Sequence, residues 1–182
     1  MSGVKARWEI RSAIEKDIPA IGELIRLSVR GLQGSHYSTA QMEAALGSVF
    51  GVDRQLIHDR SYFVIEQDQK LIACGGWSKR KTLFGGDDHS GRNDSELDPA
   101  IDAARIRAFF VHPDHARRGL GRAILRMCED AIRSGGFKKI ELASTLPGEA
   151  FYRSAGFISG KREEVTLPNG LKLGIVHMTK AV

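Results

Sequence analysis

Apolar positions recur along the chain with two different periods, and these predict strands in some segments and helices in others. Alternating or continuous apolar runs predict strands at residues 6–13, 61–67, 70–78, 104–111, 138–144, 157–165 and 171–179. Apolar residues three or four positions apart predict helices after Asp17 and at 38–49, 119–134 and 149–156. The resulting order is strand, two helices, three strands, helix, strand, helix and two strands. This α/β order predicts a mixed sheet flanked by helices.

Local signals mark where the first two helices begin. Asp17 is expected to cap the first helix, with Pro19 tolerated in its first turn. Ser38, followed three positions later by Gln41, predicts a capping box. The second helix should then continue through Met42, Leu46 and Val49.

The 119–134 segment has the sharpest division into an apolar and a charged face. Its predicted apolar stripe consists of Leu120, Ala123, Ile124, Met127, Cys128 and Ala131. The opposite face should carry Arg122, Arg126, Glu129 and Arg133. We expect the stripe to pack against the sheet.

Turn signals separate the remaining elements. Asp68-Gln69 should join two strands into a hairpin, and Asn169-Gly170 predicts another. Residues 82–99 include the polar, turn-rich sequence GGDDHSGRNDSELDP, which is typical of a mobile loop. The acidic residues of this loop are Asp87, Asp88, Asp94, Glu96 and Asp98, against a single Arg92. They would either attract a cationic amine or simply be solvated.

Composition narrows the class of protein. The 182 residues are 42% apolar and 27% charged, as in a soluble globular protein, and we expect one domain over residues 1–182. No apolar run approaches the roughly 18–20 residues of a membrane span, and the N-terminal sequence lacks the apolar stretch of a secretory signal. Cys74 and Cys128 occur without a second spaced pair. Reduced structural thiols and a cytoplasmic location are therefore expected.

The formal net charge of +5 fits a polyanionic partner, either nucleic acid or a small phosphorylated cofactor, although a basic surface without a partner is equally compatible. The stretch FFVHPDHARRGLGRAIL, residues 109–125, favours the cofactor. Here a strand leads into a turn with Arg117, Arg118, Gly119 and Gly121, and a helix with Arg122 in its first turn follows. Backbone N–H groups at a helix start, glycines that allow close approach and nearby arginines together predict a pyrophosphate site.

Two common phosphate motifs do not fit this turn. A P-loop needs a lysine and a hydroxyl residue after its last glycine, and both are absent. A dinucleotide fingerprint needs a third glycine where Ile124 stands, and its glycines should follow the strand directly. Residues 112–118 separate strand and glycines here.

The turn resembles the signature of the Gcn5-related N-acetyltransferase (GNAT) family, Arg/Gln-x-x-Gly-x-Gly/Ala at a helix start. The chain reads Ala116-Arg117-Arg118-Gly119-Leu120-Gly121, with Ala116 in place of Arg or Gln. A second stretch, EAFYRSAGF at 149–157, is similar to the family's Ala-x-x-Phe/Leu-Tyr-x-x-x-Gly-Phe segment. The resemblance implies a mostly antiparallel sheet of six to seven strands, flanked by about four helices, with splayed central strands. It also implies acetyl-CoA as the acyl donor.

The resemblance further implies roles for individual residues. The pyrophosphate would lie on the turn and first helical residues, which are Arg117, Arg118, Gly119, Leu120, Gly121 and Arg122. The pantetheine arm would pair with the backbone of Phe109, Phe110 and Val111, and one N–H of that segment would stabilise the oxyanion. The family's usual asparagine is missing, and a hydroxyl of Ser144 or Thr145 is expected to serve the arm instead.

Tyr152 is the expected proton donor to the departing thiolate, because a phenol is protonated at neutral pH. It could also be a core tyrosine. The base that deprotonates the amine is not identified by the pattern, and Glu96, Asp98 and His112 are the candidates. Tyr37 either lines the acceptor pocket or covers a helix junction, with packing favoured. No metal-ligand spacing occurs, so no metal is expected.

The sequence thus predicts direct transfer of an acetyl group from acetyl-CoA to a primary amine, in a small molecule or a peptide. The alternative is a CoA-binding regulatory module without catalytic activity. Nucleic-acid binding is weaker, because the arginines gather on one turn without interleaved aromatic residues. We expect no membrane partner, and the sequence leaves homodimerisation open.

Overall fold

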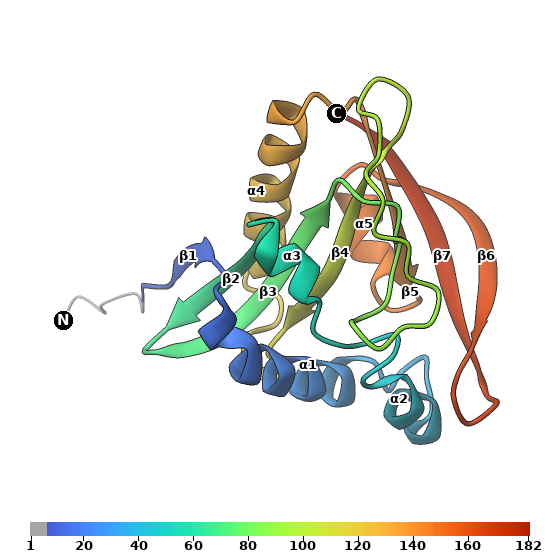
Figure 1. Cartoon of the computed structure of the whole chain (residues 1–182). Helices are drawn as coiled ribbons and strands as arrows, with labels where there is room; N and C mark the ends of the chain where they lie inside the picture. Colours follow the sequence, from blue (N-terminus) through green and yellow to red (C-terminus); the bar gives the residue numbers. More distant parts are fainter. Residues whose placement is uncertain (1–6) are drawn as a thin grey trace.

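Residues 7–182 are described by a computed structural model of the chain, in which seven strands form one sheet (Figure 1). The strands are β1 (Glu9–Ser12), β2 (Tyr62–Gln67), β3 (Lys70–Ser78), β4 (Ala104–Val111), β5 (Lys139–Thr145), β6 (Ile158–Thr166) and β7 (Lys172–Ala181). Their spatial order is β1-β2-β3-β4-β5-β7-β6. Only the β4–β5 pair is parallel. The mixed, mostly antiparallel sheet is confirmed. Ala6, predicted in the first strand, lies outside the described residues.

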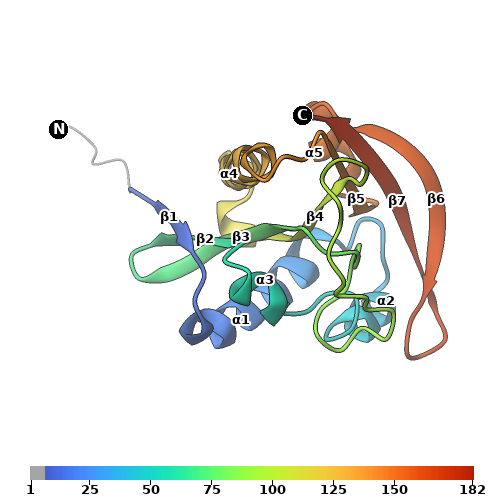
Figure 2. The same cartoon turned by 45° about the horizontal axis from the view of Figure 1, so that its top comes forward.

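Five α-helices within residues 7–182 cover the two faces of the sheet. They are α1 (Ile18–Leu32), α2 (Thr39–Ala45), α3 (Arg54–His58), α4 (Leu120–Ser134) and α5 (Glu149–Ser154). Figure 2 shows α4 on one face and α1 and α3 on the other. Each face has its own apolar core, one built around α4 and one around α1 and α2. No helix in the described part of the chain is both long and apolar enough to span a bilayer.

The second helix begins as predicted and ends earlier. The Gln41 backbone N–H donates to Ser38 Oγ (3.1 Å), and the Ser38 N–H donates to Gln41 Oε1 (2.7 Å), which confirms the capping box. Leu46 is already extended, because a turn through Gly47 with φ +90° follows it. The predicted continuation of the helix to Val49 is therefore wrong.

Asp17 stands at the predicted position before the first helix, but the predicted capping hydrogen bond is wrong. Asp17 occupies the N-cap position but makes no side-chain cap bond to α1. Its carboxylate accepts from the Ile14 backbone N–H (2.9 Å) and forms an ion pair with Arg11 on β1 (2.7 Å). Asp17 therefore joins the first strand to the helix start.

The buried face of α4 is rotated from the predicted stripe. Leu120, Ile124 and Cys128 are buried as expected, but Met127 is 40% exposed, and Leu125 and Ile132 fill the core instead. Glu129, expected on the charged face, is buried, and its carboxylate accepts from Lys180 Nζ of β7 at 2.6 Å. The buried face and the predicted stripe differ by about one residue, and both have apolar positions three and four residues apart. The spacing alone therefore did not distinguish the two orientations of the helix.

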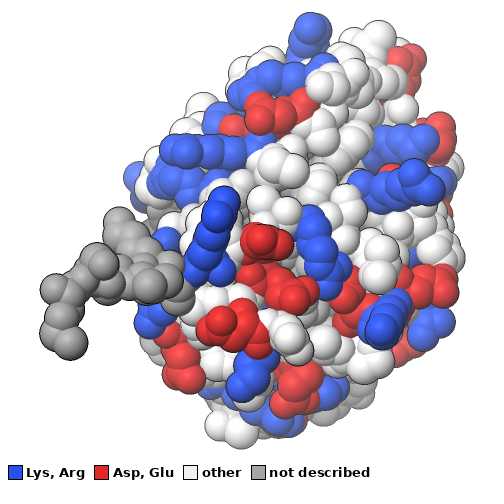
Figure 3. Space-filling model, turned by 90° about the vertical axis from the view of Figure 1, so that its left-hand side faces the viewer, with Lys and Arg blue, Asp and Glu red and all other residues white. Residues whose placement is uncertain are grey.

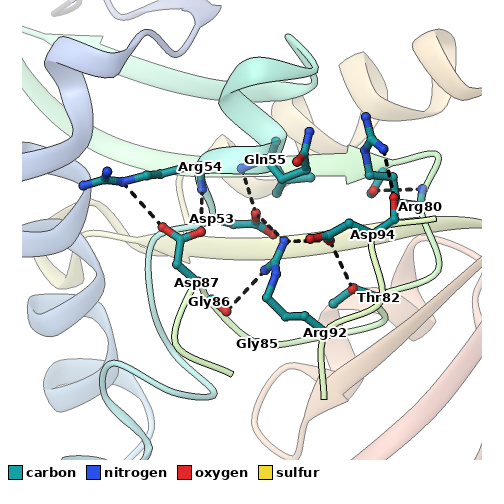
Figure 4. Close-up of polar contacts among 12 residues, drawn as sticks. Asp53, Arg54, Gln55, Arg80, Thr82, Gly85, Gly86, Asp87, Arg92 and Asp94 are labelled. Atoms are coloured by element: carbon teal, nitrogen blue, oxygen red, sulfur yellow. Dashed lines mark hydrogen bonds and ion pairs between the residues drawn. The ribbon is translucent and has the colours of Figure 1, made fainter. Parts of the chain in front are cut away.

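The acidic loop has no long regular element, but its side chains are tied to the rest of the protein (Figure 4). Arg92 contacts Asp53 (3.2 Å) and Asp94 (2.9 Å) through Nη2. Asp87 accepts from the backbone N–H of Arg54 (2.9 Å) at the start of α3. The loop is therefore anchored on α3, a helix that the sequence did not reveal, and the contacting acidic residues are not simply solvated. Its mobility stays a prediction.

Both cysteines are free and buried, and we predict that they make stability depend on alkaline pH. Burial raises the pKa of the Cys74 thiol to about 12, and burial likewise raises the pKa of Cys128. Because unfolded thiols ionise near 8.5, the stability that is present below about pH 8.5 is lost as the pH rises toward the folded pKa. From pH 7.5 to 9.5 the loss is about 1.4 kcal/mol per thiol.

Urea unfolding at these two pH values measures the effect. The C74A/C128A variant is the control, because it keeps all other titrating groups. It should be less stable at pH 7.5, owing to lost packing, and should show a smaller decline with pH. An equal decline in both proteins contradicts the prediction.

Candidate active site

The sheet opens between its two central strands. β4 and β5 pair at only two positions, Ala104 with Ile140 and Arg105 with Glu141. Beyond Arg105 the strands are no longer bonded to each other. The expected splay of the central strands is thereby confirmed, and it exposes the edge of β4 from residue 106 onward.

A bulge in β4 accompanies the opening. Ala108 has a left-handed backbone (φ 57°), and the register with β3 shifts at this point. The Ala108 carbonyl accepts a hydrogen bond from Tyr62 Oη (3.0 Å), which fixes the bulge from inside the sheet. Gly75 lies opposite, and a Cβ there would come within 2.6 Å of the Phe109 ring. The bulge therefore needs a glycine at position 75.

A cleft of about 740 Å³ lies between β4 and β5. Ten of the predicted site residues line it: Phe109, Phe110, Val111, Arg117, Gly119, Leu120, Gly121, Arg122, Thr145 and Tyr152. Arg118 and Tyr37 do not, nor do the candidate bases Glu96, Asp98 and His112. The cleft thus unites most of the predicted cofactor residues with Tyr152.

The first turn of α4 has the features of an anion site. Arg117 (φ 63°) and Gly119 (φ 83°) are both left-handed, and no side chain caps the helix. The backbone N–H of Ala123 donates to the Gly119 carbonyl (3.0 Å), which leaves the N–H groups of Leu120 to Arg122 as the orphan donors of a helix start. These donors and the positive end of the helix dipole favour a phosphate.

Two residues of the predicted pyrophosphate site, Arg122 and Gly121, also contact α5. Arg122 donates through Nη2 to Ser154 Oγ (2.9 Å). A Cβ on Gly121 would lie 3.3 Å from the Phe151 ring, so this glycine allows α4 and α5 to approach closely.

Tyr152 lies on α5 with its ring in the core and is 9% exposed. The rings of Phe109, Phe151 and Phe157 surround it, with centroids 4.9–6.1 Å away. Burial, and secondarily the nearby Cys128, raise the pKa of its hydroxyl well above the usual value. Its Oη makes no hydrogen bond to any of residues 7–182. Tyr152 therefore brings to the cleft a protonated hydroxyl without a protein partner.

Several predicted polar groups already have partners. The Val111 N–H donates to Ser28 Oγ of α1 (3.2 Å). Ser144 Oγ donates to the Thr145 carbonyl (2.7 Å), while Thr145 Oγ1 accepts from the Gly148 N–H (3.2 Å). Both hydroxyls thus stabilise the turn between β5 and α5.

Tyr37 packs between elements outside the cleft. Its Oη donates to the Gly174 carbonyl of β7 (2.6 Å) and accepts from the Leu146 N–H (2.9 Å). Burial raises the pKa of its phenol. Of the two roles that the sequence left open, the structure therefore places Tyr37 in the packing role.

Several polar residues of the cleft were not predicted from the sequence, and three of them carry unpaired or charged groups. Gln33 Oε1 and His115 Nδ1 are fully enclosed without a hydrogen-bond partner in the described part of the chain, and Arg107 lies in the wall beside the bulge. Burial lowers the pKa of His115, which favours the neutral imidazole. The sequence does mark Arg107 as unusual, since it is a charged residue inside a largely apolar strand. Gln33 had none.

Positive charge is not gathered into one stripe on the face that Figure 3 displays, where acidic and basic side chains are interspersed. This face therefore does not display the continuous basic surface that nucleic-acid binding would favour.

Comparison with known proteins identifies the family. A family model described as the acetyltransferase (GNAT) family matches residues 31–157. The chain belongs to this family. The match spans the bulged strand, the α4 turn and the α5 segment of the GNAT domain. A search of curated sequences gives no significant match.

Solved structures show the same fold at low identity. The GCN5-related N-acetyltransferase "Aminotransferase, Class-II" from Rhodopseudomonas palustris aligns over 100% of both chains, with a TM-score of 0.71 and 18% identity. PaiA N-acetyltransferase from Thermoplasma acidophilum, in complex with coenzyme A, covers 97% of this chain and 99% of its own, with a TM-score of 0.63 and 14% identity. Ribosomal-protein-alanine N-acetyltransferase from Brucella melitensis covers 96% and 99%, with a TM-score of 0.62 and 15% identity.

We predict that Gly75→Ala displaces the bulge and weakens CoA binding. The added Cβ would lie 2.6–2.8 Å from three atoms of the Phe109 ring, including Cγ, so the ring and the bulged backbone that carries it would have to shift. We expect the dissociation constant for CoA to rise at least about tenfold, or about 1.4 kcal/mol, measured by calorimetry.

Gly22→Ala in α1 is the matched control, because its Cβ would only contact Arg26 and Val52 at 3.8 Å. It should leave CoA affinity unchanged and stabilise the helix by about 0.5–1 kcal/mol. If the folded Gly75→Ala protein binds CoA as tightly as the control, the bulge does not shape the cofactor site.

Proposed function

We propose that this GNAT protein transfers the acetyl group of acetyl-CoA directly to a primary amine, with Tyr152 donating a hydrogen bond or proton to the departing sulfur. The observation that carries the proposal is the shared cleft. The uncapped start of α4, the free edge of β4 and the unpartnered Tyr152 hydroxyl all line it.

The residues of the cleft fit the donor in two places. The orphan N–H groups at the start of α4, with Arg117 beside them, would hold the pyrophosphate. The free edge of β4 would pair with the amides of the pantetheine arm.

Phe109 is the best candidate for oxyanion stabilisation. Of the three predicted backbone donors, Val111 donates to Ser28, and Phe110 is paired with Cys74 in the ladder between β4 and β3. The Phe109 N–H remains, directly after the bulge. A preorganised backbone donor at such a position stabilises developing negative charge.

The raised pKa of Tyr152 has two consequences for the chemistry. Acetyl-CoA supplies a thioester whose sulfur gains one proton on release, while the amine nitrogen loses one. Burial ensures that Tyr152 carries its proton at neutral pH, but it also disfavours the tyrosinate that full transfer would leave. We therefore expect Tyr152 to act chiefly as a hydrogen-bond donor to the sulfur.

A thermal-shift titration tests donor binding. Acetyl-CoA at about one hundred times its dissociation constant should stabilise the protein by about 2.7 kcal/mol. The melting temperature should then rise by roughly 5–10 °C for a chain of this size. NAD should give no shift. A protein that melts at the same temperature with and without acetyl-CoA does not use the cleft for this donor.

Turnover of Tyr152→Phe tests the acid role. At saturating substrates we expect kcat, followed by thiol release, to fall about 10- to 100-fold, with acetyl-CoA affinity nearly unchanged. Tyr37→Phe is the control, because it removes a buried phenol hydroxyl outside the cleft and should lower stability rather than kcat. Equal kcat in Tyr152→Phe and wild type would remove the role. Donor binding without turnover of any amine would favour the CoA-binding regulatory module.

A further inference from the structure

The charge of the cleft indicates which amines it can accept. No Asp or Glu among residues 7–182 lines it, whereas Arg107, Arg117 and Arg122 do. The carboxylates of the nearby acidic loop are largely occupied, since Asp87, Asp94 and Glu96 pair with Arg54, Arg92 and Lys79. A cationic polyamine would therefore find no counter-charge on the cleft walls.

Arg107 lies on the part of the wall away from the α4 turn, beside the bulge. It is only 4% exposed, and its Nη2 is 2.8 Å from Asp53 Oδ2 and bonds the Gly85 carbonyl. Its Nε is enclosed without a partner, and Nη1 makes no hydrogen bond within residues 7–182. Gly85 itself lines the cleft, so the guanidinium lies at the wall with unused donors.

The negative charge that balances Arg107 is shared. Asp53 is completely buried, and its other oxygen contacts Arg92 at 3.2 Å. Two guanidinium groups thus face one buried carboxylate, and Asp94, the second partner of Arg92, is partly exposed. Burial lowers the pKa of Arg107, and the positive charge of Arg92 adds to this effect. An anionic ligand at the wall would give Arg107 a counter-charge that it does not share with Arg92.

The surrounding wall is mainly apolar and has one unused acceptor. Phe50 and Phe84 line the cleft with Gly85, and Phe50 packs edge-on against Phe110 of β4. Gln33 at the end of α1 also lines it, with Oε1 enclosed and without a partner in the described part of the chain. Buried polar atoms are rarely left unpaired, so a ligand N–H is the expected partner for Gln33.

We propose, on the basis of the acetyl transfer proposed above, that the acceptor is an amine that also carries a carboxylate and an apolar body, with Arg107 binding the carboxylate. Gln33 accepts a hydrogen bond from the acceptor, and Phe50 and Phe84 pack against its apolar body. Amino acids with large apolar side chains have this combination of groups.

Matched acceptors test the proposal in the wild-type protein. Phenylalanine, phenylalaninamide and phenethylamine share one body and differ in the carboxylate, and spermidine represents cationic amines. We expect kcat/KM for phenylalanine to exceed that for the other three by at least about tenfold. Equal or higher values for phenethylamine or spermidine overturn the proposal.

Variants assign the preference to Arg107. Because Arg107→Gln alone removes the cation beside the buried Oδ2 of Asp53 and leaves Arg92 as the carboxylate's one ion-pair partner among residues 7–182, it should be combined with Asp53→Asn. This double variant should lose the preference for phenylalanine over phenethylamine. Arg92→Gln is the control, because Arg92 contacts the same Asp53 but does not line the cleft, and it should retain the preference. A preference that persists in the folded double variant overturns the role of Arg107.

A binding measurement separates this proposal from failure of the acetyl transfer. In the presence of CoA, N-acetylphenylalanine should raise the melting temperature of wild type more than N-acetylphenethylamine does. The same comparison in the double variant should show no difference. If CoA binds and neither amide does so selectively, the carboxylate site is wrong while donor binding stands. If CoA itself gives no shift, the proposed function fails first.

Discussion

Ala108 has a left-handed backbone in the middle of the sheet, a conformation that costs a residue with a Cβ about 1–2 kcal/mol. It persists because its surroundings hold it. The Tyr62 hydroxyl bonds its carbonyl from one side, and Gly75 leaves room for the following Phe109 ring on the other. β4 pairs with β5 only as far as Arg105, and the cleft occupies the space between the two strands. Arg107 precedes this bulge and Phe109, whose ring packs against Tyr152, follows it, so the bulge sets the direction of two residues that line the cleft.

The cleft lies where the two apolar cores meet. Phe109 packs with the core around α4, while Phe110, its neighbour, belongs to the core around α1 and α2. Two consecutive residues of β4 thus anchor opposite faces of the sheet, which leaves the backbone of that strand at the cleft. A local change in either core should therefore be felt at the site, because close-packed interiors transmit strain.

Much of the fold could be predicted because it depends on local patterns. The Ser38–Gln41 capping box, the 62–78 hairpin and the α4 turn each rest on residues within a few positions of one another. What could not be predicted depends on distant contacts. The five residues of α3 are too few to show a helical period, and the loop that Arg92 anchors returns to Asp53, 39 positions away. The buried position of Glu129 on α4 likewise involves a distant residue, since Lys180, 51 positions away, donates to its carboxylate.

The candidate site divides in the same way. Ten of the predicted site residues line the cleft. Those of the α4 turn and α5 follow from two local motifs, because a helix start can bind phosphate through a short stretch of backbone. The other half is assembled from α1, the acidic loop and β4, which meet only in the folded chain. Arg107 and Gln33 belong to that half, and neither carries a local motif. Glu96, Asp98 and His112 were reasonable base candidates by chemistry, but the fold directs them elsewhere.

The bond between Ser28 and Val111 has a consequence for how selective the β4 edge can be. The Ser28 hydroxyl occupies the Val111 donor without any ligand, so the strand is not left with an orphaned buried group. A ligand carbonyl arriving there would exchange one hydrogen bond for another rather than add one. Such an exchange yields little net free energy, and discrimination at that position would come from shape. Ser28 thus satisfies the Val111 N–H whenever no ligand is bound to the edge of β4.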